Sequence, residues 1–333
     1  MMTRIVILGA GGMGTALAAL FAKTTRAVLV WSRDPNRAAE LERSRENARH
    51  LPGVLLPANV LVTSNAAEAT AGAELIVVAV PSAYLRSTLA GIADSIPPGV
   101  PALSVVKGIE NQTFARPSQI IVDALGPRAV AVLSGPSHAE EFARGLPASV
   151  VVAGEDESLC VRTRDALNVG MFRVYTNPDA LGVELAGALK NVLGIAAGVC
   201  DGLGLGDNAK AALLTRGLVE IMRFGVALGA RQETFFGLAG VGDVITTCFS
   251  RHGRNRMVGE RIGRGETLDA VLANMVDVAE GVPTTRSVHD QARDRGVSVP
   301  ITDELHDILF QGKSPRAALA DLMVRLPKDE WQP

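Results

Sequence analysis

Five short, almost wholly apolar runs in the first half of the chain constrain its fold more than any other feature. They span residues 5–8, 27–31, 75–80, 102–106 and 129–133. Strands that are apolar on both faces suit a parallel sheet covered by helices on both sides. Helix-length segments lie between the runs, as in repeated strand–helix–strand units. These patterns predict an α/β domain built on a parallel sheet, and residues 149–152 and 172–175 fit later strands of that sheet.

The second half of the chain has a different character. After about Asn177 the strand runs stop, and Ala, Leu and Gly recur with helical periodicity. Pro315 after Ser314 is typical of a capped first helical turn, and Thr302 and Asp303 after Pro300 suggest another helix start. We therefore predict an α/β domain over residues 1–180 and an all-α domain over residues 181–333.

A glycine-rich turn follows the first predicted strand and opens a helix predicted over residues 15–23. Gly9, Gly11 and Gly14 fit the pattern GxGxxG. The first glycine permits a tight turn, the second lets a pyrophosphate approach the backbone, and the third lets the helix pack on the strand. The helix N-terminus also favours an anion. With a strand on either side in place, the pattern predicts dinucleotide binding; the alternative is a glycine-rich turn of another α/β protein.

The end of the second predicted strand bears on which dinucleotide is bound. An NAD site usually has an acidic residue there, about 20 positions after the glycines. This chain has Arg33, followed by Asp34. A guanidinium can bind a 2′-phosphate through two hydrogen bonds, so Arg33 favours NADP, while Asp34 leaves NAD open. The alternative is that Arg33 is a solvated loop residue.

Lys190 is the candidate acid–base residue, on a helix predicted over residues 183–194. The residues three and four positions away are Ala186, Gly187, Leu193 and Gly194. None is acidic, so the helix itself offers no partner for the ammonium group. Burial without a partner would lower the pKa of a lysine, which suits proton transfer, whereas the alternative is a lysine that snorkels to the surface.

Composition excludes several classes of function. The net charge of −2 offers no bulk field for nucleic acid or an acidic membrane. The three cysteines form no CxxC pair and the five histidines show no metal-ligand spacing, which favours a reducing cytoplasm and no metal. The apolar run over residues 5–22 is interrupted by glycines. Because no other stretch approaches about 20 apolar residues, we expect no membrane span.

An ordered set of motifs along nearly the whole chain resembles the bacterial NAD(P)-dependent glycerol-3-phosphate dehydrogenase family. The motifs span residues 9–16, 51–53, 79–82, 106–110, 133–137, 184–191, 201–206, 237–243, 254–256 and 280–282. The resemblance implies a Rossmann-like N-terminal domain and a helical C-terminal domain. It implies reversible NAD(P)H-dependent reduction of dihydroxyacetone phosphate to sn-glycerol 3-phosphate for glycerophospholipid synthesis. It also suggests a cytoplasmic homodimer.

The resemblance also implies roles for individual residues. Lys190 matches the family's proton donor and acceptor, and Lys107 matches a lysine that touches both cofactor and substrate. The substrate-binding positions are matched by Lys107, Gly135, Ser137, Lys190, Asp243, Gly253, Arg254 and Asn255. The cofactor-binding positions are matched by Gly9, Gly11, Gly12, Met13, Gly14, Arg33, His50, Lys107, Ala139, Arg254, Val278 and Glu280.

The chain departs from the family pattern at several of these positions. Gly12 and Met13 stand where serine and an aromatic residue are usual, although backbone amides can make those contacts. His50 stands where tyrosine is common, and His138 where phenylalanine is common. Gly253 takes the place of a serine, which removes a hydroxyl that could contact the substrate.

The chemistry of ketone reduction fits the residues present. Negative charge develops on the carbonyl oxygen during hydride transfer, and Lys190 and Lys107 are the available ammonium groups. Lys107 directly follows a predicted strand, where ligands bind in open α/β sheets. Asp243 could orient an ammonium, bind a substrate hydroxyl or cap a helix. Arg254 and Asn255 offer a fork and an amide to a phosphate.

Three alternatives remain open from the sequence. One is another two-domain NADP-dependent reductase, of the ketopantoate or hydroxyisobutyrate type, although Arg254 and Asn255 favour a phosphorylated substrate. Another is a sensor that binds NADPH without catalysis. The third reads the basic run from Arg251 to Arg256 as a solvated loop. A hydrolase is disfavoured because Ser137 lies in no GxSxG elbow.

Overall fold

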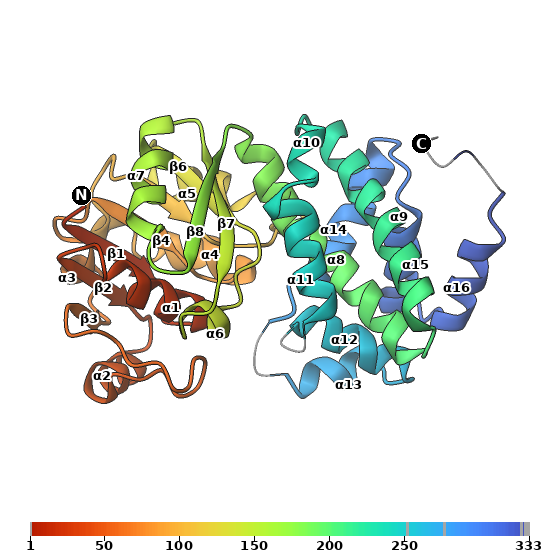
Figure 1. Ribbon diagram of the computed structural model, residues 1–333, viewed down its shortest axis with the longest axis horizontal. Coiled ribbons are helices and arrows are strands. Elements are labelled where there is room, and N and C mark those ends of the chain that lie inside the picture. The colour runs from red at the N-terminus through yellow and green to blue at the C-terminus, as the bar shows by residue number, and fades with distance from the viewer. Residues whose placement is uncertain (1, 251–252, 276–277, 327–328, 330–333) are drawn as a thin grey trace. The chain divides into compact units, whose positions relative to one another are not determined.

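The computed structural model describes residues 2–250, 253–275, 278–326 and 329, and the chain forms two compact units (Figure 1). The first unit comprises Met1–Lys107 and Arg116–Glu184. The second comprises Gly108–Ala115 and Leu185–Pro333. The short segment Gly108–Ala115 therefore packs with the second unit, which no periodicity in the sequence indicated.

The first unit is built on an eight-stranded sheet with the order β3-β2-β1-β4-β5-β6-β7-β8. The strands are β1 (Arg4–Leu8), β2 (Ala27–Trp31), β3 (Val60–Thr63), β4 (Leu75–Val78), β5 (Ala102–Ser104), β6 (Val130–Ser134), β7 (Ala148–Gly154) and β8 (Phe172–Asn177). All neighbours pair in parallel except β6 and β7, which are antiparallel. The predicted parallel α/β sheet is thus confirmed, with one reversal that was not predicted.

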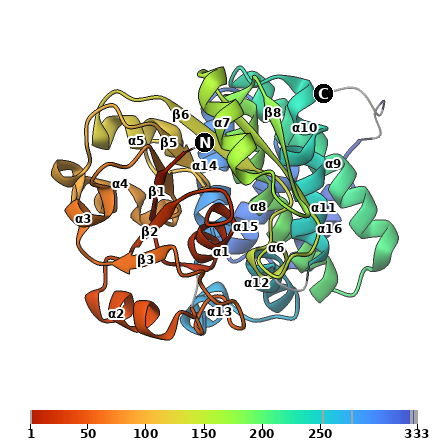
Figure 2. The ribbon, with the colours of Figure 1, turned by 60° about the vertical axis from the view of Figure 1, so that its left-hand side comes forward.

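Helices cover both faces of this sheet. They are α1 (Gly12–Phe21), α2 (Pro35–Ser44), α3 (Ala66–Thr70), α4 (Ser82–Ala90), α5 (Pro117–Leu125), α6 (Ala139–Phe142) and α7 (Glu157–Leu167), with a 3-10 turn at Ala93–Ser95. Figures 1 and 2 show α1, α6 and α7 over one face and α3, α4 and α5 over the other. Double coverage explains why β1 and β4 are apolar at successive positions, with every residue from Ile5 to Leu8 fully buried.

The second unit is helical throughout its described residues. Its helices are α8 (Ala180–Gly202, which begins in the first unit), α9 (Gly206–Ala227), α10 (Gln232–Phe235), α11 (Asp243–Phe249), α12 (Arg254–Gly263), α13 (Leu268–Ala273), α14 (Gly281–Asp294), α15 (Pro300–Phe310) and α16 (Pro315–Met323). A π-helical turn, Leu238–Gly242, precedes α11. The all-α prediction is confirmed, and Ser314 caps α16 as expected, since its Oγ accepts from the backbone N–H of Ala317 at 3.1 Å.

Two predicted helix starts are wrong by a few residues. Helix α1 begins at Gly12 rather than at residue 15. Helix α15 begins at Pro300 rather than near Thr302, because proline suits the first helical position and the cap comes from elsewhere. The carboxylate of Glu220 on α9 accepts the backbone N–H groups of Ile301 and Thr302, both at 2.8 Å, and the Thr302 hydroxyl at 2.6 Å.

The buried carboxyl of Glu220 makes stability depend on pH. Burial raises the pKa of Glu220 to about 7, although hydrogen bonds from Thr302 and Ile301 oppose this shift. Between pH 4.5 and about 7 the folded chain therefore binds more protons at this site than the unfolded chain. The free energy of unfolding is expected to fall across that window as pH rises, by on the order of 3 kcal/mol from this group.

Thermal unfolding of the wild type and of Glu220→Gln, measured from pH 5 to pH 8, tests this expectation. Glutamine cannot titrate, so the midpoint of the wild type should fall relative to that of the variant as pH rises. A midpoint difference that stays constant with pH would refute it.

Helix α8 corrects one expectation about membranes. Residues Ala180–Leu203 reach a mean hydropathy of 1.5, so this helix is long and apolar enough to cross a membrane by length and composition. The expectation that no such stretch exists beyond the N-terminal run is therefore wrong. The whole window is buried inside the protein, however, as in the core helix of a globular fold. The hydropathy of α8 therefore does not by itself indicate a membrane span.

Candidate active site

The glycine-rich turn joins β1 to α1 and leaves open space beside its second glycine. Gly9 has a φ of +115°, and a Cβ there would lie 2.7 Å from the carbonyl oxygen of Ala79. A Cβ on Gly14 would lie 1.9 Å from the carbonyl oxygen of Gly9, so the third glycine is required by close packing. A Cβ on Gly11 would meet no atom within 4 Å, and no side chain caps α1 there. The turn therefore fits an approaching phosphate at Gly11.

Two departures from the family pattern lie together in this turn. A Cβ on Gly12 would lie 2.8 Å from the carbonyl oxygen of His50. A serine at position 12 would therefore require the segment around His50 to move. Met13 is partly buried and packs on the core of the first unit. The unusual glycine is thus explained by the close approach of the backbone at His50.

The residues after β2 differ in their surroundings: one caps a helix and another is exposed to solvent. The carboxylate of Asp34 accepts from the backbone N–H groups of Asn36 and Arg37, at 2.9 and 3.4 Å, and so caps α2. Arg33 is exposed. Arg37, which the sequence analysis missed, donates from Nη2 to the carbonyl oxygen of Ala10 at 3.0 Å. Arg37 lies on α2, four positions after Arg33, which precedes the cap of that helix, and this spacing was the available signal.

Lys107 lies with two other predicted residues at the ends of β5 and β6. Its Nζ donates to the carbonyl oxygen of Gly135 at 2.8 Å and to Oγ of Ser137 at 3.1 Å. The Ser137 hydroxyl also donates to the Gly135 carbonyl, at 2.8 Å. Ala139 opens α6 directly afterwards and is buried. Residues far apart in the sequence thus form one polar cluster in the first unit, as expected at the ends of neighbouring strands.

Lys190 lies in a buried cluster of the second unit. Its Nζ is 2.7 Å from Oδ1 of Asp243 and donates to Oγ1 of Thr247 at 2.6 Å. Lys190 and Asp243 are only 7% and 2% exposed. Because an ammonium has three hydrogens, these two contacts leave one for a ligand oxygen.

The helix of Lys190 offers no acidic partner, as expected, but a carboxylate from another helix supplies one. Asp243 is 53 positions away in the sequence, so a search of neighbouring helical positions could not find it. Asp243 opens α11, and Thr247 follows one turn later on the same face. Of the roles considered for Asp243, the structure shows the orientation of an ammonium. Thr247 was not predicted as a partner of Lys190. It lies four positions after Asp243, and this spacing, which places both side chains on one helical face, was the available signal.

Asn255 links three helices of the second unit. Its Nδ2 donates to Oδ1 of Asn191 at 2.9 Å, and its Oδ1 accepts from the backbone N–H of Gly281 at 2.9 Å. The amide therefore holds the first turn of α12 against α8 and the start of α14. Glu280 directly precedes Gly281, and Val278 lies just before it. One N–H of the Asn255 amide remains for a ligand.

The remaining basic residues begin α12. Arg254 is its first residue and is exposed, and Arg256 follows on the same turn. A Cβ on Gly253 would lie 2.9 Å from the carbonyl oxygen of Thr247, so the usual serine would need a local shift. Arg251 lies outside the described residues.

The described residues offer neither a metal-binding cluster nor a reactive thiol beside Lys190. Those residues contain no group of three or more His, Cys, Asp and Glu side chains that could hold a metal ion. Cys248 on α11 lies close to the Lys190 cluster, but burial raises the pKa of its thiol to about 12. Such a thiol stays protonated at neutral pH and is a poor nucleophile.

Comparison with known proteins places the chain in a family. The sequence model described as the N-terminus of NAD-dependent glycerol-3-phosphate dehydrogenase matches residues 4–160, and that of its C-terminus matches residues 179–320. The chain belongs to the NAD-dependent glycerol-3-phosphate dehydrogenase family. The family and the fold class predicted from the sequence are thus confirmed.

Relatives in this family match over nearly their whole length. A glycerol-3-phosphate dehydrogenase (NAD(P)+) of Chlorobium limicola is 48% identical over 329 residues, which cover 98% of this chain and 99% of the relative. One of Moorella thermoacetica is 46% identical over 321 residues, or 96% of each chain. The crystal structure of glycerol-3-phosphate dehydrogenase from Coxiella burnetii matches with a TM-score of 0.92 and 34% identity, covering 97% of this chain and 99% of that one.

Proposed function

We propose that this chain catalyses the reversible NAD(P)H-dependent reduction of dihydroxyacetone phosphate to sn-glycerol 3-phosphate. The observation that carries the proposal is the buried cluster of Lys190, Asp243 and Thr247 in a chain of this family. The product supplies the glycerol backbone of glycerophospholipids. The resemblance to the family also supports a homodimer in the cytoplasm.

The first unit carries most of the residues proposed to bind the nucleotide. The open turn at Gly11 and the uncapped N-terminus of α1 suit the pyrophosphate, and Arg33 suits a 2′-phosphate. Because the carboxylate of Asp34 already caps α2, it is less available to ribose hydroxyls, which supports a preference for NADP over NAD. When bound, the reduced nicotinamide supplies a hydride to the carbonyl carbon.

The second unit carries the acid–base residue. Lys190 donates a proton from Nζ to the ketone oxygen as negative charge develops there, and it takes that proton back when the alcohol is oxidised. The carboxylate of Asp243 and the hydroxyl of Thr247 hold the ammonium in place, since both contact Nζ directly.

The substrate phosphate requires cations. Arg254 presents an exposed guanidinium at the start of α12, and Asn255 offers an N–H beside it. Lys107, together with Ser137 and the backbone of Gly135, offers a second polar cluster for the substrate in the first unit. A phosphorylated three-carbon ketone suits these groups better than an apolar substrate does.

The deciding experiment mixes the purified chain with NADPH and dihydroxyacetone phosphate and follows the absorbance of the reduced nicotinamide. Loss of absorbance that depends on both chain and substrate supports the proposal. Turnover of ketopantoate or of a hydroxyisobutyrate-type substrate, with none of dihydroxyacetone phosphate, would replace it. Binding of NADPH without turnover of any of these would favour the sensor.

Cofactor preference is tested by Arg33→Ala. The variant is expected to raise KM for NADPH about 10-fold or more, because a charge-assisted bond to the 2′-phosphate is lost, and to change KM for NADH by less than about 3-fold. The matched control is Arg43→Ala, which removes an exposed arginine from the last turn of α2, the helix that begins just after Arg33. Equal losses with both cofactors would exclude the 2′-phosphate role.

A further inference from the structure

Helices α8 and α12 of the second unit pack backbone against backbone. Glycines recur every four residues on α8, at 194, 198 and 202, and on α12, at 259 and 263. A Cβ on Gly198 would lie 2.0 Å from the carbonyl oxygen of Arg256, and one on Gly259 would lie 1.9 Å from that of Ile195. At these glycines no side chain lies between the two helices, so the shape of the two backbones fixes the position of one helix relative to the other.

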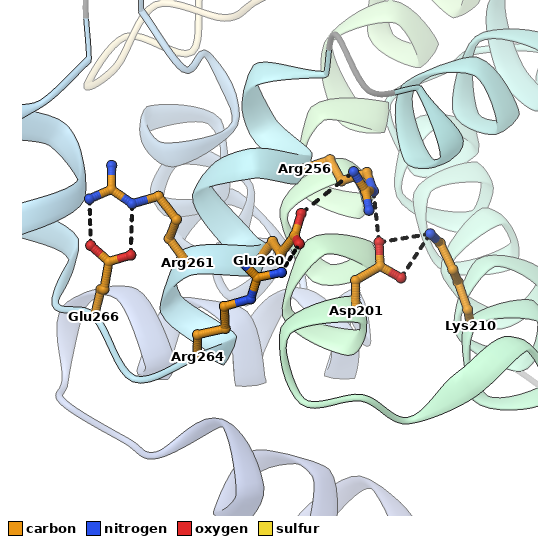
Figure 3. A network of polar contacts seen from close by, with 7 residues as sticks. All are labelled: Asp201, Lys210, Arg256, Glu260, Arg261, Arg264 and Glu266. Carbon is orange, nitrogen blue, oxygen red and sulfur yellow. Dashed lines mark hydrogen bonds and ion pairs between the residues drawn. The ribbon is translucent and has the colours of Figure 1, made fainter.

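Polar bridges join the first turn of α12 to α8 at both ends of the row of glycines on α8. At one end is the hydrogen bond from Asn255 to Asn191. At the other end the carboxylate of Asp201, on the last turn of α8, accepts from Nε of Arg256 at 2.7 Å (Figure 3). Lys210 of α9 binds the same carboxylate, with Nζ 2.9 Å from each oxygen.

These contacts are better enclosed than the ion pairs that Arg261 and Arg264 form near the end of α12, and Arg256 also lies 3.6 Å from Glu260. The side chains of Asp201 and Arg256 are each 21% exposed and that of Lys210 is 8% exposed. At the far end of α12, Arg261 pairs with Glu266, whose side chain is 41% exposed (Figure 3). Exposed pairs contribute little, whereas partly buried pairs with several hydrogen bonds can fix a local geometry.

We propose that Asp201 is a positioning residue for the reaction, which holds the first turn of α12 through Arg256. That turn also carries Arg254 and Asn255, and the same helix α8 carries Lys190. The bridge therefore keeps the phosphate-binding groups at a set distance from the proton donor. The phosphate and the ketone of the substrate are held at a fixed separation by covalent bonds. If the first turn of α12 shifts, a substrate whose phosphate is bound there has its ketone displaced from Lys190. This inference rests on the proposed function.

The test is Asp201→Asn, which keeps the shape of the side chain and removes its charge. We expect kcat/KM for dihydroxyacetone phosphate to fall about 10-fold or more, since small misplacements in a site have large kinetic effects. We expect kcat/KM for dihydroxyacetone, which lacks the phosphate, to stay within about 2-fold when NADPH is saturating. The matched control is Glu266→Gln, which breaks the exposed pair with Arg261 of the same helix and should leave both quantities within about 2-fold.

A double-mutant cycle with Arg256→Met locates the effect. If Asp201 acts through Arg256, the double variant is no slower with dihydroxyacetone phosphate than Arg256→Met alone. Equal losses with both ketones, or additive losses in the cycle, would overturn the positioning role. A wild-type kcat/KM for dihydroxyacetone phosphate in Asp201→Asn would also overturn the positioning role, but it would leave the proposed function intact. Failure of the wild type itself to reduce dihydroxyacetone phosphate would instead refute the proposed function.

Discussion

Replacing Lys190 with methionine is expected to lower kcat by about 1,000-fold, because no buried ammonium then protonates the forming alkoxide. Methionine has a similar length and an apolar stem, so the buried position on α8 stays filled. Lys190 is not one of the predicted cofactor-binding residues, most of which lie in the first unit, so Kd for NADPH should stay within about 2-fold. Steady-state kinetics and a fluorescence titration with NADPH measure the two quantities.

A suitable control for this variant is Lys313→Met. Lys313 belongs to the same unit and forms ion pairs with Glu304 and Asp321, but it is not one of the proposed site residues. It should keep kcat within about 2-fold. If Lys190→Met retains turnover within about 10-fold of the wild type, another group must deliver the proton and the assignment fails.

Strands could be predicted where their burial produces a recognisable pattern in the local sequence. β1, β2 and β4 are covered on both faces, so their sequences are continuously apolar and easily found. β3 lies at the edge of the sheet, and Leu61 in it is 50% exposed between buried Val60 and Val62. Its short alternating pattern carries a weaker signal and was missed. The reversal between β6 and β7 depends on pairing between strands, which the composition of either strand does not encode.

The candidate site shows the same difference between features that are local in sequence, which could be predicted, and contacts between distant segments, which could not. The turn from Gly9 to Gly14 was predicted because its pattern of glycines lies within six successive positions. The partners of Lys190 were not, because Asp243 and Thr247 reach it from another helix. Asp201 was missed for the same reason, since its bond to Arg256 spans 55 positions. Local sequence therefore identified the residues with charge, and only the fold showed which charges meet.

The ion pair between Lys190 and Asp243 leads to the second large effect. Asp243→Asn is expected to lower the free energy of unfolding of the second unit by about 3 kcal/mol, because it leaves the Lys190 ammonium buried without a counter-charge. Turnover should fall about 100-fold, since the amide holds the ammonium less firmly. Unfolding monitored by thermal denaturation and steady-state kinetics give the two measurements.

The double variant Lys190→Met with Asp243→Asn separates the two contributions. Removing both charges eliminates the uncompensated ammonium, so stability should recover toward that of the wild type, while turnover should stay as low as in Lys190→Met. If Asp243→Asn is as stable as the wild type, the pair is not the buried, mutually compensating contact that its 2.7 Å separation indicates. If the double variant regains turnover, Lys190 is not the proton donor, because its ammonium has been removed.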